Sequence, residues 1–359
     1  MRNRLLLLFI SLGMSLFLGF MSCCDDCPTC PKEEEPPPLG KFRLYSICFW
    51  DGMLISYDIP ADTIVDSVTL PYQSYGVFVT PDGERLLVMR AQENNFGMDI
   101  FSARDLSLLG STNQYGDYYF DGTDGYGIML SFTDESIYFV DPVNLYPTDT
   151  IVRFGNHGYL DTVGNNFFGV KYPGINIVYR IDCNIRQLID SIVLPGTEIS
   201  EICYNHYSNE LYYSCYNPYP YAYFIQYDLN NKTILNETMM TGGSWGAAIT
   251  IEGDRIFAND SGSRDWLPPG YIWVFDALTN EVCHLIEPFD YATGTILHPS
   301  FGQILMTPDG RRAYIASSYS MIAETPIAVV DLQTEKIIKV LPSAYGFGGT
   351  SIALGPVPE

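Results

Sequence analysis

The sequence has few of the residues on which common catalytic sites depend. Among its 359 residues are four histidines, and no two of them have a metal-ligand spacing such as HxH or HExxH. No glycine-rich phosphate loop is present either. From these shortages we predict no catalytic residues, no metal site and no cofactor.

Basic residues are also scarce. The chain has 19 lysines and arginines against 42 acidic residues, which gives a formal net charge of −23. Such a surface repels nucleic acid and anionic membranes, so we expect no nucleic-acid partner. The chain has no long amphipathic helical stretch, and its 27 tyrosines and 31 glycines are typical of an all-β protein.

The N-terminal segment has a composition of its own. Arg2 and Arg4 precede a long apolar run, which ends next to Cys23. This pattern predicts a bacterial lipoprotein signal peptide over residues 1–22, with the Cys23 thiol as the lipidation site. An uncleaved membrane helix is the alternative. The expected location is the bacterial cell envelope, anchored by lipid to a membrane and facing the periplasm or the cell surface.

Residues 23–41 are rich in cysteine, proline and glutamate and predict a semi-rigid, extended tether. Within it, Cys24, Cys27 and Cys30 have the spacing CxxCxxC. A metal cluster would need a fourth ligand, and none follows nearby. Whether these cysteines form a disulfide or bind metal stays open. A disulfide between two later cysteines, Cys203 and Cys215 on neighbouring predicted strands, is also possible, although buried cysteines often act as small apolar residues.

The rest of the chain repeats a unit of four short apolar runs. The unit is clearest at 302–342, where the runs lie in QILMTPDG, RAYIASS, IAVVD and LQTEKIIKVLP. An aspartate after the third run recurs at spacings of about 40 to 55 residues, as expected of propeller blades with four strands each. We interpret these aspartates as turn caps. They are Asp58, Asp141, Asp182, Asp228, Asp276 and Asp331, with Ser102 in the remaining place.

The first unit lacks its first strand and begins at residues 43–49. The last segment, GTSIALGP at 349–356, has the pattern of a first strand without its own unit. We therefore predict a seven-bladed β-propeller of four-stranded antiparallel blades over residues 42–359. Pairing of the C-terminal strand with the first blade is expected to close the ring, which removes exposed sheet edges.

Two of the units carry a recognisable family pattern. FVTPDGERLLV and LMTPDGRRAYIASS resemble the YVTN-type β-propeller repeat, and the looser pattern covers residues 42–356. The resemblance implies a seven-bladed, often extracellular propeller without a single activity. Relatives of that type include surface-layer proteins, lactonase-like enzymes and quinoprotein dehydrogenase subunits, so the fold alone leaves the function open.

Two sets of ring-bearing residues are candidates for binding. The first set precedes glycine where each innermost strand is expected to begin, around one mouth of the central channel; it is Tyr75, Tyr115, His157, Trp245 and Tyr345. These rings could stack on a ligand, or they could pack between blades while the glycine lets the chain bend. The second set lies in loops between the second and third strands; it is Tyr219, Tyr221, Trp266 and Tyr319.

Together these features predict a monomeric, non-enzymatic scaffold that binds a protein or a glycan, because no catalytic set accompanies the aromatic residues. The alternative is a lactonase-like or quinoprotein-dehydrogenase-like enzyme with its site at the mouth of the central channel. An enzyme would need ionisable groups that converge there with shifted pKa values, and this requirement distinguishes the two hypotheses.

Overall fold

The computed structural model describes residues 41–358, except for 49–51, 62, 92–95, 121–125, 133, 154–156, 162, 171–175, 217–221, 241, 243, 245, 261–270, 288, 291–294, 297–301, 317–326 and 342–349. The chain divides into two compact units, Met1–Pro38 and Leu39–Glu359, and the described residues all belong to the second. The predicted signal peptide, Cys23 and most of the tether lie outside them. No helix in the described part is long and apolar enough to cross a membrane.

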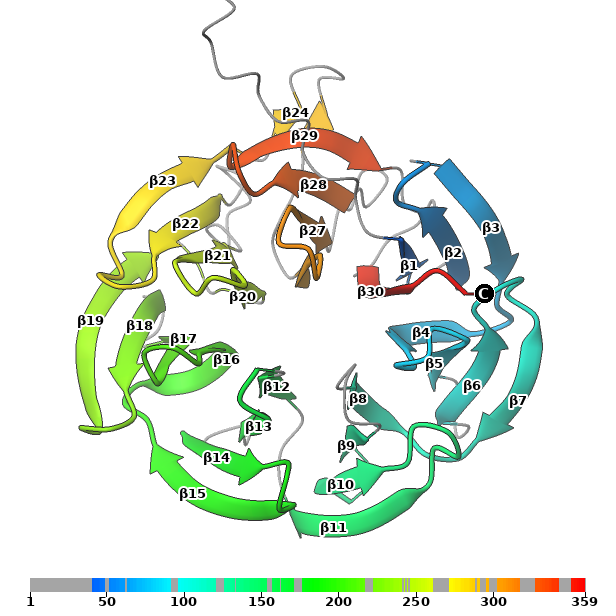
Figure 1. Ribbon diagram of the computed structural model, residues 1–359, viewed down its shortest axis with the longest axis horizontal. Helices are drawn as coiled ribbons and strands as arrows, with labels where there is room; N and C mark the ends of the chain where they lie inside the picture. The colour runs from blue at the N-terminus through cyan, green and yellow to red at the C-terminus, as the bar shows by residue number, and fades with distance from the viewer. Residues whose placement is uncertain are drawn as a thin grey trace, which may run out of the picture. The chain divides into compact units, whose positions relative to one another are not determined.

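Seven four-stranded antiparallel sheets form a ring of blades (Figure 1). Blade 1 has the order β3 (Thr63–Thr69), β2 (Met53–Asp58), β1 (Phe42–Cys48) and β30 (Thr350–Pro356). From the axis outwards, blades 2 to 4 are β4 (Gln73–Val79), β5 (Arg85–Ala91), β6 (Gly97–Ser102), β7 (Leu108–Thr112); β8 (Gly116–Phe120), β9 (Gly127–Ser131), β10 (Ser136–Val140), β11 (Pro147–Arg153); and β12 (His157–Asp161), β13 (Asn166–Val170), β14 (Ile177–Asp182), β15 (Gln187–Val193).

Blades 5 to 7 repeat this order. They are β16 (Thr197–Asn205), β17 (Glu210–Tyr216), β18 (Ala222–Asp228), β19 (Thr233–Met240); β20 (Ala247–Ile249), β21 (Arg255–Asn259), β22 (Ile272–Asp276), β23 (Val282–Ile286); and β26 (Ile304–Met306), β27 (Arg312–Ala316), β28 (Ile327–Asp331), β29 (Lys336–Leu341). The predicted all-β, seven-bladed propeller is confirmed. A short hairpin that the sequence did not predict, β24 (Phe289–Asp290) with β25 (Thr295–Ile296), lies between blades 6 and 7 in the chain.

Both ends of the propeller contribute to blade 1. The C-terminal β30 pairs antiparallel with β1, from Phe42 opposite Pro356 to Cys48 opposite Thr350. Each innermost strand also contacts the innermost strand of the next blade, and β30 contacts both β4 and β26. The segment that the sequence marks as an unpaired first strand therefore lies in the first blade.

The aspartates at the ends of the third strands cap the turns that follow, as predicted. Asp276 Oδ1 accepts hydrogen bonds from the backbone nitrogens of Leu278 and Thr279, at 2.9 and 3.0 Å. Asn280 then adopts a left-handed φ of 53°, and the ladder to β23 shifts register by a bulge. Equivalent bonds are made by Asp58, Asp141, Asp182, Asp228 and Asp331.

Buried apolar side chains fill every junction between neighbouring blades. Phe224 of β18 stacks on Phe275 of β22, with ring centroids 4.7 Å apart, across blades 5 and 6. Cys203 and Cys215 are buried as free thiols, so the possible disulfide between them is wrong. No blade could bury both of its faces alone, which explains why the repeats fold as one ring.

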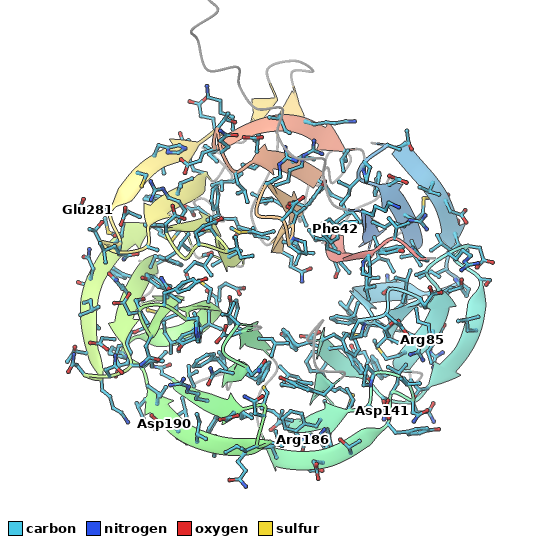
Figure 2. The ribbon with its side chains drawn as sticks, in the orientation of Figure 1. Phe42, Arg85, Asp141, Arg186, Asp190 and Glu281 are labelled. Atoms are coloured by element: carbon cyan, nitrogen blue, oxygen red, sulfur yellow. The ribbon has the colours of Figure 1, made fainter. Side chains whose placement is uncertain are left out.

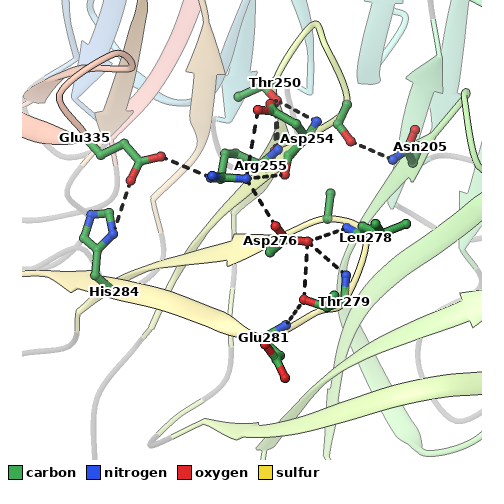
Figure 3. Close-up of polar contacts among 12 residues, drawn as sticks. Asn205, Thr250, Asp254, Arg255, Asp276, Leu278, Thr279, Glu281, His284 and Glu335 are labelled. Atoms are coloured by element: carbon green, nitrogen blue, oxygen red, sulfur yellow. Dashed lines mark hydrogen bonds and ion pairs between the residues drawn. The ribbon is translucent and has the colours of Figure 1, made fainter.

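Polar bonds also join the blades away from the axis. Arg85 at the start of β5 donates to the carbonyl oxygens of Val143 and Pro142 in blade 3, at 2.6 and 2.7 Å; Figure 2 labels Arg85 and the neighbouring Asp141. Between blades 6 and 7 the acceptor is a side chain, the carboxylate of Glu335, instead of backbone carbonyl groups (Figure 3). This carboxylate lies 3.4 Å from Arg255 Nε and 3.2 Å from His284 Nδ1.

Candidate functional site

One face of the ring, which we call the mouth face, carries the start of each innermost strand and the end of each second strand. In blade 3, for example, Gly116 at the start of β8 lies opposite Ser131 at the end of β9. Most of the loops on this face are outside the described residues. So are six candidate binding residues, Trp245, Tyr345, Tyr219, Tyr221, Trp266 and Tyr319, and for His157 only the backbone at the start of β12 is described.

The structure brings together the two candidates whose side chains it describes. The Tyr115 ring lies 5.0 Å from that of Phe96 and 5.4 Å from that of Phe132. Burial raises the pKa of Tyr115, and smaller contributions come from Tyr75 and Asp117. The strand that carries Tyr75, β4, contacts β8, which begins directly after Tyr115. Tyr75 and Phe96 are 55% and 52% exposed. We call Tyr75, Phe96, Tyr115 and Phe132 the aromatic cluster.

The glycines beside these rings have a structural reason. A Cβ on Gly116 would lie 1.9 Å from the carbonyl oxygen of Leu130, and a Cβ on Gly246 would lie 2.1 Å from that of Gly302. Any side chain would therefore displace backbone. The glycine in the repeated pattern lets strands approach each other near the axis, whereas the exposed rings of the aromatic cluster are not needed for that approach.

A buried charge pair supports blade 2 near the mouth face. Arg90 Nη1 lies 2.5 Å from Asp99 Oδ1, and the two side chains are 12% and 7% exposed. Asp99 also accepts hydrogen bonds from the hydroxyls of Tyr72, at 2.5 Å, and Ser111, at 2.6 Å. Burial raises the pKa of Tyr72, and so do its bond to Asp99 and the charge of that carboxylate. Each oxygen of the carboxylate thus has a partner, as a buried charge requires.

A second group of ionisable side chains lies where the innermost strands of blades 3, 4 and 5 are neighbours (Figure 1). Asp117 and Tyr119 are two positions apart on β8, so both leave the same side of the strand. The half-buried Tyr119 accepts a hydrogen bond from the backbone nitrogen of Gly158, at 3.2 Å. Burial raises its pKa well above the usual value, and the charges of Asp117 and of Glu201 on β16 raise it further.

We call Asp117, Tyr119 and Glu201 the Tyr119 site. Its phenol stays protonated at neutral pH while two half-buried carboxylates act on it through their charge. The sequence analysis missed all three residues. Asp117 and Tyr119 alternate along β8, but nothing local in the sequence connects them with Glu201 on another blade.

The sequence analysis also missed a short motif. Residues 242–246 read GGSWG, which matches the GxSxG spacing of a nucleophile elbow. The match lies between β19 and β20, whereas an elbow joins a strand to a helix. Ser244 is fully buried; its hydroxyl donates to the carbonyl oxygen of Gly246, at 3.1 Å, and its backbone nitrogen donates to Ser214 Oγ, also at 3.1 Å. This serine has a structural role.

The described histidines pair with carboxylates away from the Tyr119 site. His206 Nδ1 lies 3.6 Å from Asp161 Oδ2, and His284 pairs with Glu335. Within the part of the chain that the structure describes, no group of three or more histidine, cysteine, aspartate or glutamate side chains could hold a metal ion.

No family model matches the sequence, and no curated protein matches it. Among solved structures, the chain is similar to dihydro-heme d1 dehydrogenase NirN in complex with DHE, with a TM-score of 0.57 and 16% identity over 88% of this chain and 66% of that one. It is also similar to hydrazine synthase from Kuenenia stuttgartiensis, with a TM-score of 0.62 and 13% identity over 79% of this chain and 90% of that one. At these identities the likeness shows the propeller fold alone.

The comparison corrects the prediction of a non-enzymatic scaffold for protein or glycan. Both similar structures are of proteins named as enzymes, which favours the alternative, a propeller enzyme with its site at the channel mouth. The prediction was wrong because it relied on catalytic motifs that are local in the sequence. In a propeller, charged groups from different blades can act on one side chain, as Asp117 and Glu201 do on Tyr119.

Proposed function

We propose that this chain is a propeller enzyme that opens small cyclic esters by hydrolysis at its channel mouth. The observation that supports this reaction best is the Tyr119 phenol, which accepts a hydrogen bond from the Gly158 nitrogen and whose pKa is raised by burial and by the charges of two carboxylates. A hydrogen-bond donor and a base are the two groups that ester hydrolysis needs, and this site supplies both from the chain itself.

In the proposed reaction Glu201 takes a proton from water as the water oxygen bonds to the carbonyl carbon. Tyr119 donates a hydrogen bond to the carbonyl oxygen, where negative charge develops. The ring C–O bond then breaks, and the leaving oxygen takes the proton from Glu201 to give an open-chain hydroxy acid. Because the Gly158 nitrogen donates to the phenol oxygen, the phenol's own O–H is directed by that bond.

The test is hydrolysis of a panel of γ- and δ-lactones by the purified full chain, followed with a pH indicator. Tyr119→Phe should lower kcat by about 100- to 1,000-fold, the usual loss for one oxyanion donor. Tyr146→Phe is the matched control, because Tyr146 is 71% exposed in a turn on the opposite face. Hydrolysis of no lactone, or equal rates in Tyr119→Phe and the unaltered chain, would contradict the proposal.

A dehydrogenase-like reaction is the second candidate. It is favoured by the similarity to a dehydrogenase and by the resemblance of the repeats to those of quinoprotein dehydrogenase subunits. The described histidines do not suit a haem at the channel mouth, since His206 lies in the turn between β16 and β17 on the opposite face and His284 lies on the outermost strand β23. We derive no step through such a group. Reduction of a redox dye in the presence of small alcohols, without lactone hydrolysis, would favour this candidate.

We further propose that the enzyme is a monomer of the YVTN-repeat type held at the bacterial envelope. The TPDG turns at 80–83 and 307–310 support the repeat type: in each, the threonine hydroxyl bonds the aspartate at 2.5 Å and the glycine has a positive φ. The apolar N-terminal run before Cys23 supports a lipid anchor. Replacement of Cys23 by alanine should release the protein from the membrane fraction; unchanged fractionation would exclude lipidation there.

A further inference from the structure

The aromatic cluster is built from two blades and is open to solvent. Tyr75 belongs to β4, Phe96 precedes β6, and Tyr115 and Phe132 flank β8 and β9 of blade 3. The Tyr115 ring is inclined by 51° to Phe96 and by 72° to Phe132. Two of the four side chains, Tyr75 and Phe96, are more than half exposed, so much of each of these rings is open to solvent.

A negative charge accompanies the rings. Asp117 lies two residues after Tyr115, at the start of β8 on the mouth face. Burial is the largest cause of the raised pKa of Tyr115, and the negative charge of Asp117 contributes to it. The whole chain has a formal net charge of −23, and such a protein attracts cations to its surface.

We propose that the aromatic cluster and Asp117 bind an organic cation, of the alkylammonium class, at the mouth face. The faces of tyrosine and phenylalanine rings carry partial negative charge and attract ammonium groups, most strongly where several rings meet. Asp117 adds a full charge of the same sign beside them. A neutral ring such as a sugar would gain stacking on the same side chains but would gain nothing from the carboxylate.

Cation binding beside the Tyr119 site also restricts which cyclic esters the enzyme would accept. This restriction rests on the proposed function. Asp117 lies between the aromatic cluster and Tyr119 in the sequence and acts on both phenols. An ammonium group held by Asp117 would leave Glu201 as the base of the Tyr119 site. The substrate class is then a small cyclic ester that carries a positively charged amine.

The experiment compares choline with its neutral isostere, 3,3-dimethylbutan-1-ol, by calorimetric titration of the full chain. We expect choline to bind about tenfold more tightly, within the range of a cation–π contact. Tyr75→Leu and Phe96→Leu should each weaken choline binding by about threefold or more, and both residues are exposed enough for the fold to tolerate them. Tyr75→Phe keeps the ring and is the matched control; Asp117→Asn should weaken choline and leave the isostere unchanged.

Equal affinity for choline and the isostere would overturn the proposal, because the surface would then be simply apolar. Unchanged choline binding in both leucine variants would overturn it too. Binding is measured without turnover, so the outcome is separate from that of the proposed function. A chain that prefers choline but opens no lactone would refute the hydrolysis alone, and one that opens lactones without this preference would refute the cation site alone.

Discussion

Raising the pH above 10 should unfold the propeller, because its buried tyrosines resist ionisation. Burial raises the pKa of Tyr45 and of Tyr57 to about 12. In the unfolded chain both phenols would ionise near pH 10. Between these values the folded state binds more protons than the unfolded state, so the free energy of unfolding falls as the pH rises. The stabilisation is complete below pH 10 and is lost on the way to pH 12.

The size of the effect follows from these two residues alone. Each phenol that stays protonated only in the folded state costs about 1.4 kcal/mol of stability per pH unit. Two phenols over two units therefore remove about 5 kcal/mol, which is comparable with the whole stability of many domains. Burial also raises the pKa of Tyr118 and Tyr213, which adds to the loss.

The assay follows tyrosinate absorbance and circular dichroism together while the pH is raised from 8 to 13. We expect the buried phenols to ionise in the same step in which the strand signal disappears. Tyr45→Phe should reduce the pH slope of stability by about 1.4 kcal/mol per unit, although it also loses a hydrogen bond to the Ala103 carbonyl. Tyr146→Phe should leave the slope unchanged. Full ionisation of all phenols near pH 10 with the fold intact would refute this reasoning.

Three further variants test contacts within and between the blades. Arg90→Met leaves the buried Asp99 without its charged partner and should cost about 3–5 kcal/mol in denaturant unfolding; a loss under about 1 kcal/mol would mean that the pair is solvated. Gly116→Ala forces a Cβ against the Leu130 carbonyl and should lower the unfolding midpoint markedly, with an unchanged midpoint as the contrary result. Glu335→Gln breaks a partly exposed bridge between blades and should cost only about 0.5–1 kcal/mol, less at high salt; no salt dependence would argue against an ionic contribution.

The fold could be predicted from the sequence because its signals are local and repeated. Each blade carries its own turn glycines, its apolar strands and an aspartate such as Asp276, which bonds backbone only two and three residues away. The tail at 349–356 could be placed because the first blade lacks one strand. The hairpin of β24 and β25 was missed, since two-residue strands leave no periodic pattern.

The site could be predicted only in part. Tyr75 and Tyr115 stood out because an exposed ring before glycine is a local signal. Tyr119 lies on β8 of blade 3 and Glu201 on β16 of blade 5, and β12 of blade 4 contacts both strands only when the ring assembles. The pKa of Tyr119 depends on that assembly, since burial between blades is its largest cause. No motif search along one strand could have found this combination.

The most direct measurement is a double-mutant cycle on the rate of lactone opening by the full chain, with Tyr119→Phe, Glu201→Gln and the double variant. If the two residues act on one substrate in one site, the double variant should lose about as much kcat/KM as the worse single variant. Glu252→Gln, in an exposed turn on the opposite face, should change nothing. Losses that multiply as if the residues were independent, or rates that none of these changes alter, would contradict a shared site at the channel mouth.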